Sequence, residues 1–392
     1  MPTAVRWCSS AAGTGASLSL REEARAWLEE NLTGAFAGAR GLGGPGREHE
    51  GHEIRLAWER HLGKAGWTCL AWPERYGGRE ASLADQVAFH EEYALADAPA
   101  RVGHIGEGLL GPTLLQFGTD EQKARFLPPV QRGEELWCQG YSEPDAGSDL
   151  AGVRTRASLE GGRWVITGQK VWTSLAHVAD WCFALCRTEP GSQRHRGLSY
   201  LLVPMRQPGV EVRPIVQMTG TSEFNEVFFD GATTDAANVV GAPGDGWRVA
   251  MATLAHERGA STLGQQIGFR RELDKVIETA RRTGAAEDPV LRDRLVRAWL
   301  ELRIMRLNAL RTMRPDPGPE ASIGKLYWSE WHRRLGELAQ AVQGRAGLVA
   351  PGGELNDLQR LYLFSRADTI YAGSSEIQRT IIAERTLGLP RQ

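Results

Sequence analysis

The chain has 392 residues, which is more than one ordinary hydrophobic core accommodates, so we expect two or three subdomains packed together. Hydrophobic residues make up 42% and charged residues 24% of the chain, a composition typical of a globular protein. The formal net charge of -2, without a block of like charge, argues against a nucleic-acid partner or an anionic membrane surface.

The five cysteines are scattered, so no disulfide framework is expected in a chain that can bury a large core, and Cys182 and Cys186 are predicted to be buried thiols. No His-Glu-x-x-His or paired Cys-x-x-Cys spacing indicates a metal site. The N-terminal segment lacks the apolar core of a signal peptide, and no run reaches transmembrane length. We therefore expect a cytoplasmic protein whose residues 1–18 form a loose tail.

Residues 19–136 are predicted to form a helical N-terminal domain. The segment REEARAWLEENL places Ala24, Leu28 and Leu32 on one helical face. Helical spacing returns in HEIRLAWERHLGKAG and in LADQVAFHEEYALAD. The segment between the first two helical patterns, Gly41 to Gly51, is rich in glycine and is predicted to be a mobile loop.

The sequence pattern changes from that of helices to that of strands over residues 137–242. The segments RWVITGQKVWTS, GLSYLLVP, VEVRPIV and NEVFFDG are short, rich in β-branched or aromatic residues, and separated by Gly, Pro and Ser. Long amphipathic helices return over residues 243–392, interrupted by RPDPGPEA. The pattern thus predicts a helical domain, a β domain and a second helical domain, an α+β multidomain protein.

The most informative segment joins the first helical zone to the β zone and reads QGYSEPDAGSD, from Gln139 to Asp149. Taken alone, a structural Gly/Asp/Ser turn explains it about as well as a ligand site. Together with GWTCLAWPERYGG and GPTLLQFGTDEQKARFLPPVQRGE before it, the segment resembles the acyl-CoA dehydrogenase family, and the resemblance extends from about Gly66 over nearly the whole chain. It implies an FAD-dependent enzyme with an antiparallel β-barrel-like middle domain and a C-terminal four-helix bundle.

The resemblance also implies how the isoalloxazine of FAD is held. Gly147 lets the backbone approach a planar ligand, and Ser142 and Ser148 offer hydroxyl groups, Ser148 also on the substrate side. In GQKVWTS, Trp172 is implied to pack on the isoalloxazine and Ser174 to reach the nitrogen that receives hydride; a buried tryptophan of the β core is the alternative. The remaining implied FAD contacts are Gln139, Tyr141, Thr173, Gln343, Gly344, Gly347, Ser374 and Glu376.

The implied reaction removes two hydrogens across Cα–Cβ of a thioester, which requires a base and polarisation of the carbonyl group. Many family members carry a carboxylate directly before the Gly of the C-terminal motif, but in IYAGSSEIQR this position is Ala372. Ala372 cannot accept a proton, although its backbone N–H can still donate to the thioester oxygen. Gly373 is implied to lie beside the thioester.

Another branch of the family, including isovaleryl-CoA dehydrogenase, carries its base on the first helix after the β domain, which here matches Glu257. Helical spacing supports an inward-facing Glu257 on a stripe of small or apolar residues, namely Ala250, Leu254, Ser261 and Gly264. Desolvation there would raise the pKa of the carboxyl group towards neutral pH. The alternative is an ion pair within the bundle, and the same two readings apply to Arg258, implied to bind substrate.

Two departures affect the AMP half of the FAD site. The common Arg-x-x-Phe-Gly motif is replaced by FRRELDKVIETARRTG, and Gln-x-x-Gly-Gly-x-Gly by QAVQGRAG. Both resemble the actinobacterial branch that acts on bulky acyl groups, some members of which assemble from two different chains.

The expected partners are an acyl-CoA or acyl-carrier thioester, an electron transfer flavoprotein or similar acceptor, and other subunits in a homodimer, homotetramer or heterotetramer. A non-catalytic or FAD-sharing subunit and a flavin monooxygenase on the same fold are the alternative functions.

Overall fold

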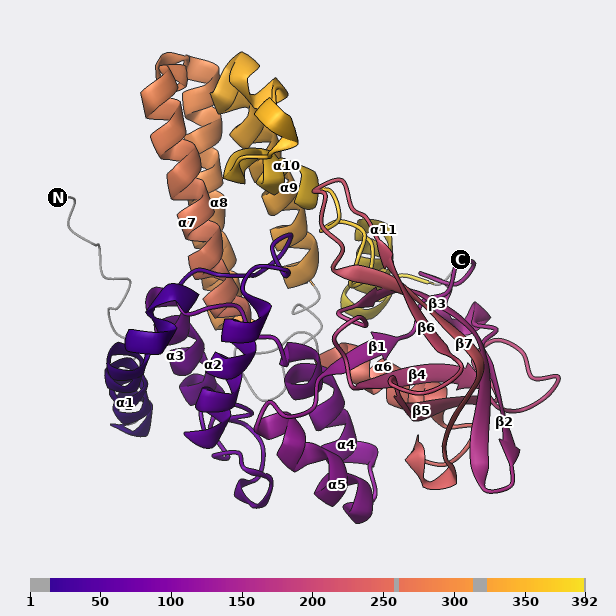
Figure 1. Ribbon diagram of the computed structural model, residues 1–392. Coiled ribbons are helices and arrows are strands. Elements are labelled where there is room, and N and C mark those ends of the chain that lie inside the picture. The colour runs from indigo at the N-terminus through magenta and orange to yellow at the C-terminus, as the bar shows by residue number, and fades with distance from the viewer. Residues whose placement is uncertain (1–14, 257–260, 313–322, 391–392) are drawn as a thin grey trace.

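The computed structural model describes residues 15–256, 261–312 and 323–390, which form a helical part, a β part and a tall helical bundle (Figure 1). The predicted order of helical, β and helical domains is confirmed. Glu257 and Arg258, the predicted base and its neighbour, lie outside the described residues.

Five helices build the N-terminal part: α1 (Gly15–Asn31), α2 (His52–Lys64), α3 (Leu83–Leu95), α4 (Gly111–Phe117) and α5 (Asp120–Gln131). The predicted apolar face is confirmed, because Ala24 and Leu28 of α1 and Leu32 directly after it are 0 to 1% exposed and pack in the domain core. Side chains define the helix starts: Ser82 caps α3, and Thr119 forms a capping box with Gln122 in α5.

The glycine-rich segment from Gly41 to Gly51 was predicted to be a mobile loop, but the structure packs it against two other parts of the chain. A Cβ on Gly43 would lie 2.2 Å from Cζ of Arg55, and one on Gly46 would lie 2.9 Å from the ring of Phe364. Arg55 is 1% exposed and donates to the carbonyl oxygen of Glu48 at 2.7 Å. The glycines therefore permit close packing, which the sequence pattern alone does not distinguish from flexibility.

The middle part is one eight-stranded sheet. Its strands are β1 (Trp137–Gly140), β2 (Arg156–Glu160), β3 (Arg163–Ser174), β4 (Trp181–Arg187), β5 (Leu198–Pro204), β6 (Val210–Ile215), β7 (Phe224–Asp235) and β8 (Val239–Val240). The order is β6-β7-β3-β2-β4-β5-β8, with β1 added beside β4. Pairing is antiparallel except for β1 with β4 and β2 with β4. Cys182 and Cys186 are fully buried free thiols, as predicted.

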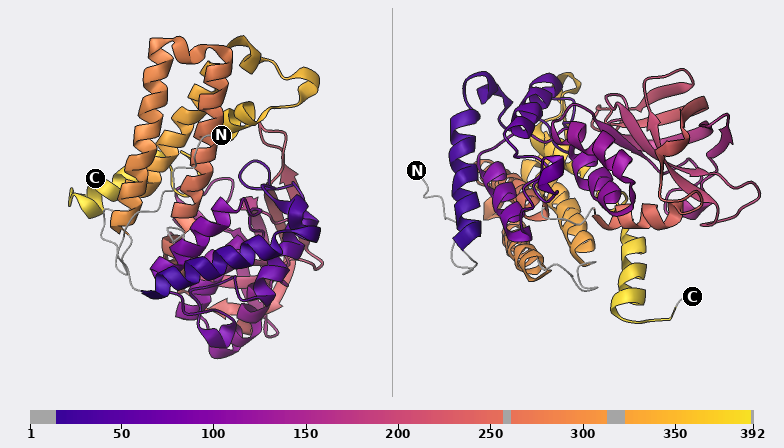
Figure 2. Two further views of the ribbon diagram at one scale, coloured as in Figure 1. Left: turned by 90° about the vertical axis from the view of Figure 1, so that its left-hand side faces the viewer. Right: turned by 90° about the horizontal axis from the view of Figure 1, so that it is seen from below.

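The C-terminal part comprises α6 (Gly246–His256), α7 (Ser261–Thr283), α8 (Pro289–Thr312), α9 (Ile323–Gln343), α10 (Asp357–Phe364) and α11 (Ser375–Ile381). Helices α7 to α10 form the bundle around a core that includes Phe269, Leu273, Trp331 and Leu335. Helix α6 lies apart from this bundle and packs on β5 and α4. Figure 2 shows α11 leading away from the bundle towards the C-terminal end.

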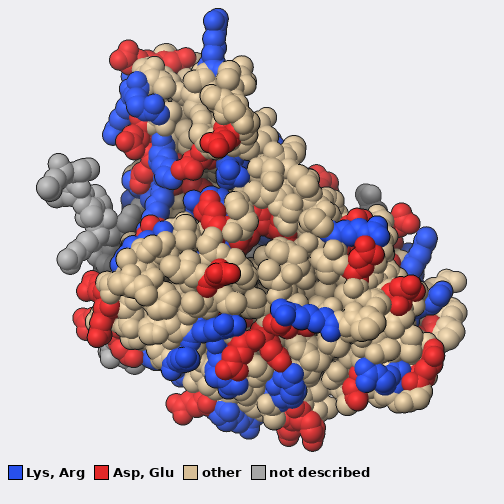
Figure 3. Space-filling model, viewed as in Figure 1, with Lys and Arg blue, Asp and Glu red and all other residues tan. Residues whose placement is uncertain are grey.

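Charged groups of both signs are interspersed over the face seen in Figure 3. This agrees with a net charge near zero, and the described residues of this face present no broad single-sign field to a polyanion. Within the described ranges, no helix combines the length and apolar character needed to cross a membrane.

Candidate active site

A buried ion pair holds the turn that follows β1. Lys170 is fully buried and its Nζ donates to Glu143 Oε1 at 2.8 Å and to the carbonyl oxygens of Tyr141 and Leu185 at 3.1 and 2.7 Å. Burial raises the pKa of Glu143, but the charge and hydrogen bond of Lys170 outweigh it and the net shift is downwards. The ionised pair therefore sets the shape of the turn, a role that sequence reasoning did not assign to either residue.

The other residues of this turn divide into an inner and an outer set. The ring of Tyr141 lies in the hydrophobic core, with ring centroids 5.9 Å from Phe183 and 6.2 Å from Tyr200. Gly147 and Ser148 are exposed, and a Cβ on Gly147 would meet no atom within 4 Å. The outer surface of the turn is therefore open to a ligand, whereas the phenol of Tyr141 faces the protein interior.

Trp172 has an unusual backbone and an exposed ring. Its φ is +59°, and the register of β3 against β7 shifts between Lys170 and Thr173. The side chain is 59% exposed and contacts Phe224 edge-on at 6.1 Å. A left-handed backbone at a non-glycine residue costs about 1–3 kcal/mol and is concentrated at functional sites, and a bulge redirects a side chain. The alternative of a buried core tryptophan is therefore wrong.

Two buried polar atoms of the middle part lack partners. Oγ1 of Thr173, the residue after Trp172 in β3, and Nε2 of Gln139 in β1 make no hydrogen bond to any described residue, while Ser174 is half-buried. A buried polar group without a partner costs about 1–3 kcal/mol, so a ligand with a polar edge that reached these atoms would be stabilised. An exposed aromatic ring, an open glycine turn and two unpaired polar atoms fit the planar, polar-edged isoalloxazine of FAD.

A second turn precedes α11. Ala372 and Gly373 have φ values of +52° and +86°, and their backbone N–H groups bond to no described residue. Nε2 of Gln378 donates to the carbonyl oxygen of Ala372 at 3.2 Å and would lie 2.5 Å from a Cβ on Gly373. The Ser374 hydroxyl caps α11 by accepting from Ile377 N–H at 3.4 Å. The turn thus offers free N–H donors but no carboxylate, and Glu376 beyond it is exposed.

The predicted contacts to the far end of FAD lie on a separate segment. Both polar atoms of Gln343 are engaged within the chain, Oε1 by Asn356 at 2.8 Å and Nε2 by the carbonyl oxygen of Ala339 at 3.0 Å. A Cβ on Gly344 would meet open space, whereas one on Gly347 would lie 2.4 Å from Oε1 of Gln340. That oxygen is buried and unpaired among the described residues, so Gln340 is a polar group that sequence reasoning missed.

The loop between β6 and β7 joins the three parts of the molecule. In this loop, the carbonyl oxygen of Glu223 accepts a hydrogen bond from the N–H of Leu175, just after β3, at 2.9 Å. The side-chain Oε1 of Glu223 accepts from the N–H of Glu48 in the N-terminal part at 3.3 Å. Arg360 of α10 donates to the carbonyl oxygen of Thr219 at 3.3 Å. The end of β3, which carries the exposed tryptophan, and α10, which leads to the second turn, therefore meet at one junction.

The helices on either side of residues 257–260 contact the N-terminal part. On α6, Oγ1 of Thr253 lies 2.8 Å from Oγ1 of Thr113 in α4, and both side chains are fully buried. On α7, a Cβ on Gly264 would lie 3.0 Å from the carbonyl oxygen of His90 in α3. Of the predicted inward stripe, Ala250 is fully buried, and Leu254 and Gly264 are half-buried.

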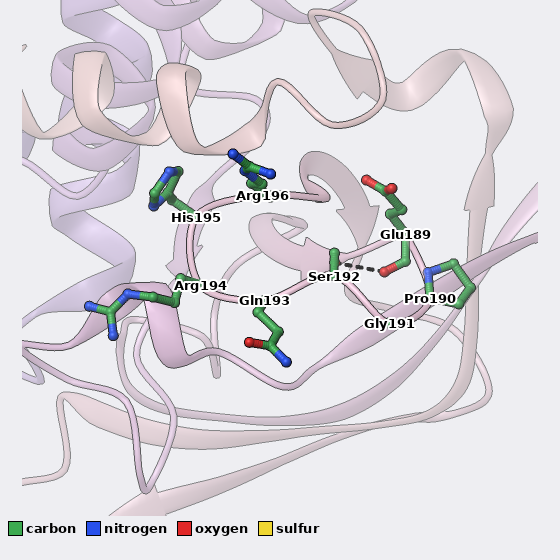
Figure 4. Close-up of a pocket in the computed structure, with 8 residues that line it drawn as sticks. All are labelled: Glu189, Pro190, Gly191, Ser192, Gln193, Arg194, His195 and Arg196. Atoms are coloured by element: carbon green, nitrogen blue, oxygen red, sulfur yellow. Dashed lines mark hydrogen bonds between the residues drawn. The ribbon is translucent and has the colours of Figure 1, made fainter.

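A pocket that sequence reasoning missed lies in the loop between β4 and β5 (Figure 4). It is lined by the loop itself, Glu189 to Arg196, and its basic side chains are Arg194, His195 and Arg196. Beneath it, Arg187 donates to the carbonyl oxygens of Arg194 and Arg196 at 3.0 and 2.9 Å, and to that of Val153 at 3.2 Å. Arg187 therefore connects the loop to Val153, in the segment that follows the turn after β1. The guanidinium groups of Arg194 and Arg196 in the loop suit a phosphate.

Comparison with known proteins places these features in a family. Models of the N-terminal, middle and C-terminal domains of acyl-CoA dehydrogenases match residues 14–134, 138–232 and 244–387. The chain is 65% identical over 376 residues to the acyl-CoA dehydrogenase IpdE1 of Mycobacterium tuberculosis, covering 95% of this chain and 97% of that protein.

Chains in two solved structures share the fold. A Tcur3481-Tcur3483 steroid ACAD chain superposes with a TM-score of 0.82 at 30% identity, covering 98% of this chain and 100% of that one. A chain of the ChsE4-ChsE5 complex from Mycobacterium tuberculosis superposes with a TM-score of 0.81 at 30% identity and the same coverage.

Proposed function

Because this chain belongs to the acyl-CoA dehydrogenase family, whose members are FAD-dependent flavoproteins, we propose that it dehydrogenates an acyl-CoA thioester across Cα–Cβ with Glu257 as the base. The family assignment makes the chain an oxidoreductase of lipid metabolism and favours dehydrogenation over hydroxylation. The observation that carries the proposed site is Trp172, an exposed ring on a left-handed bulge beside the unpaired Thr173 hydroxyl. A protein tolerates such a backbone where the surroundings or a ligand require it.

In the proposed mechanism, bound FAD supplies the acceptor for the β-hydride. Trp172 would cover the flavin and keep water from it, while Gln139 and Thr173 would hold its polar edge. Ala372 and Gly373 direct their free N–H groups at the thioester oxygen, so negative charge can develop there as the α-proton leaves. Glu257 takes that proton, and a Cα–Cβ double bond remains. Ala372 itself offers only its backbone.

The basic loop between β4 and β5 supports coenzyme A as the carrier of the acyl group. Coenzyme A contains three phosphate groups, and the loop that lines the pocket carries three successive cationic or ionisable residues, Arg194, His195 and Arg196. A phosphopantetheine on a carrier protein presents a single phosphate and would gain less from this loop.

The test is anaerobic reduction of the protein-bound flavin by butyryl-CoA, isovaleryl-CoA and cyclohexanepropanoyl-CoA. Wild-type protein should lose the visible flavin absorbance with at least one of them, whereas Glu257→Gln should retain flavin and lose this bleaching. Glu287→Gln, at an exposed residue in the bundle, is the matched control and should behave as wild type. Full bleaching of Glu257→Gln would overturn the assignment of the base.

A second candidate, an FAD-sharing subunit of a heteromer, is favoured by the state of Gln343, whose polar atoms are both used within the chain. The names of the two solved structures above, Tcur3481-Tcur3483 steroid ACAD and ChsE4-ChsE5 complex, each combine two components. Purification of this chain alone discriminates the two: a yellow homomer supports a complete FAD site, and a colourless chain that gains flavin only with a second subunit supports the shared site.

A further inference from the structure

A buried histidine connects two helices of the bundle to the segment before the second turn. His332 on α9 is 5% exposed, its Nδ1 lies 2.5 Å from Asp368 Oδ2, and its Nε2 lies 2.7 Å from Oε2 of Glu272 on α7. Burial lowers the pKa of His332, but the two carboxylates outweigh it and raise the pKa to about 10. The imidazole is therefore a cation held between two anions near neutral pH.

Asp368 also contacts the residue that precedes the turn. It is 1% exposed, and its second carboxylate oxygen, Oδ1, accepts from the hydroxyl of Tyr371 at 2.6 Å. Its carbonyl oxygen accepts from Nζ of the buried Lys325 on α9 at 2.5 Å. Tyr371 is the residue before Ala372, so one carboxylate joins the bundle directly to the base of the turn.

The backbone of the turn accounts for only part of its shape. One backbone hydrogen bond closes the turn, from Ser375 N–H to the carbonyl oxygen of Thr369 at 2.9 Å, while Ala372 and Gly373 donate none to the described residues. Two successive left-handed residues persist only where the surroundings hold them. Besides the bond between Ser375 and Thr369, the side chains of Asp368, Tyr371 and Gln378 hold the turn.

The ionic character of this connection is also informative. A buried ion pair is weak evidence for stability, because apolar residues of similar volume often stabilise a core as well or better. The bundle already has an apolar core around Phe269 and Trp331. The directed contacts of the carboxylate therefore have a use beyond holding the helices together, which is to fix the position of one attached segment.

We propose that Asp368 is a positioning residue for the reaction, which His332 and Lys325 hold in place and which sets the Ala372–Gly373 turn through Tyr371. The inference rests on the proposed function, in which the N–H groups of this turn bind the thioester oxygen. A displaced turn would polarise the carbonyl group less in the transition state while leaving most of the substrate contacts intact. Asp368 is 1% exposed and contacts the turn through Tyr371, so the role proposed for it is positioning.

The first test separates positioning from general stability. Asp368→Asn keeps the shape of the side chain but weakens its pairing with His332, and should reduce the limiting rate of flavin reduction per bound flavin by about tenfold or more, with KM changed by less than about threefold. The probe is whichever of butyryl-CoA, isovaleryl-CoA or cyclohexanepropanoyl-CoA bleaches wild-type holoenzyme. Glu301→Gln, which breaks an ion pair with Arg334 between α8 and α9 away from the turn, is the control and should leave the rate unchanged.

A double-mutant cycle tests the route through Tyr371. If Asp368 acts through the hydroxyl of Tyr371, then Asp368→Asn with Tyr371→Phe should be no slower than Asp368→Asn alone, because residues of one network are not additive. If the two substitutions multiplied each other's loss of rate, Asp368 would not act through Tyr371 and the inference would be overturned. An unchanged limiting rate per flavin with reduced flavin content would show a role in folding only and would also overturn it.

Amide hydrogen exchange gives a readout that does not depend on activity. Asp368→Asn should speed exchange in a peptide covering residues 369–376 and leave α8 unchanged, while Glu301→Gln should not affect residues 369–376. If wild-type protein reduced no flavin, the proposed function would fail, and this measurement would still decide whether Asp368 sets the turn. Unchanged exchange at 369–376 in Asp368→Asn would refute the inference.

Discussion

Lys170 and Glu143 form a buried ion pair, with Nζ 2.8 Å from Oε1, underneath the turn that carries Ser142 and Ser148. The same ammonium group bonds two carbonyl oxygens, so all three of its protons have partners inside the sheet. The turn on one side of the proposed flavin site therefore takes its shape from a charge on the strand that carries Trp172. Substitution of either residue should therefore weaken cofactor binding as well as lower the stability of the protein.

The first prediction concerns removal of one partner. Lys170→Met should leave the Glu143 carboxylate buried without its cation and destabilise the protein by about 3–5 kcal/mol. Urea denaturation of the holoenzyme measures this loss, and the flavin content should fall with it. Lys275→Met, which removes an exposed ion pair with Asp357, is the control and should cost less than about 1 kcal/mol. Equal losses in both variants would contradict the structural role of Lys170.

The second prediction separates stability from binding at Trp172. Trp172→Gly removes an exposed ring and relieves a left-handed backbone, so the melting temperature without FAD should stay the same or rise. Flavin affinity should nevertheless fall at least about tenfold, because a stacking surface is lost. Leu159→Ala, at a similarly exposed residue on β2, should change neither quantity. Unaltered FAD affinity in Trp172→Gly would remove this ring from the site.

Local sequence patterns are sufficient to predict some features of the fold. The apolar face of α1 and the three-part order follow from periodicity, because each depends on which side of a local element is buried. The residues of the proposed site could be found through the resemblance in Gln139 to Asp149 and in GQKVWTS. Their mutual arrangement depends on the loop between β6 and β7, which no local pattern reveals.

Non-local pairing explains what was missed. Lys170 in a strand looks like a solvent-facing charge, and its burial follows only from a carboxylate 27 positions earlier in the chain. His332 and Asp368 are 36 positions apart, on a helix and in a turn. The exposure of Trp172 depends on a shift in register against β7, and alternation along β3 predicts a regular strand there. In each case the decisive contact is tertiary.

The third prediction concerns the second turn. Gly373→Ala would place a Cβ 2.5 Å from Nε2 of Gln378 at a φ of +86°, so either the turn or Gln378 must move. The limiting rate of flavin reduction should fall at least about tenfold, because the N–H groups of the turn would leave their position. Gly388→Ala has a similar φ of +67° and open space for its Cβ, so it serves as the control for backbone strain. Equal rates in the two variants would argue against a role of the turn in the reaction.

The fourth prediction tests the basic loop. Arg194→Ala should raise KM for an acyl-CoA by about threefold to tenfold, through loss of a phosphate contact, while KM for the corresponding acyl-pantetheine, which lacks phosphate, stays the same. Steady-state kinetics with both substrates provide the comparison. Arg213→Ala, which removes an exposed cation paired with Glu211 on β6, should affect neither substrate. A proportional rise of both KM values would show that the loop does not bind the phosphates.

The fifth prediction is a pH dependence of stability that arises from His332. The pKa of this imidazole is raised to about 10 in the folded protein by Glu272 and Asp368, against about 6.5 in the unfolded chain. Between these values the folded state binds the additional proton, so the free energy of unfolding falls as the pH rises. The contribution should be complete below about pH 6.5 and lost on passing about pH 10.

Urea denaturation at several pH values should therefore show a steeper alkaline loss of stability in wild-type protein than in His332→Gln, which cannot carry this charge. His104→Gln, at an exposed residue, controls for the removal of a histidine and should follow the wild-type slope. Parallel slopes for wild type and His332→Gln would mean that the imidazole is not held as a cation between its two carboxylates.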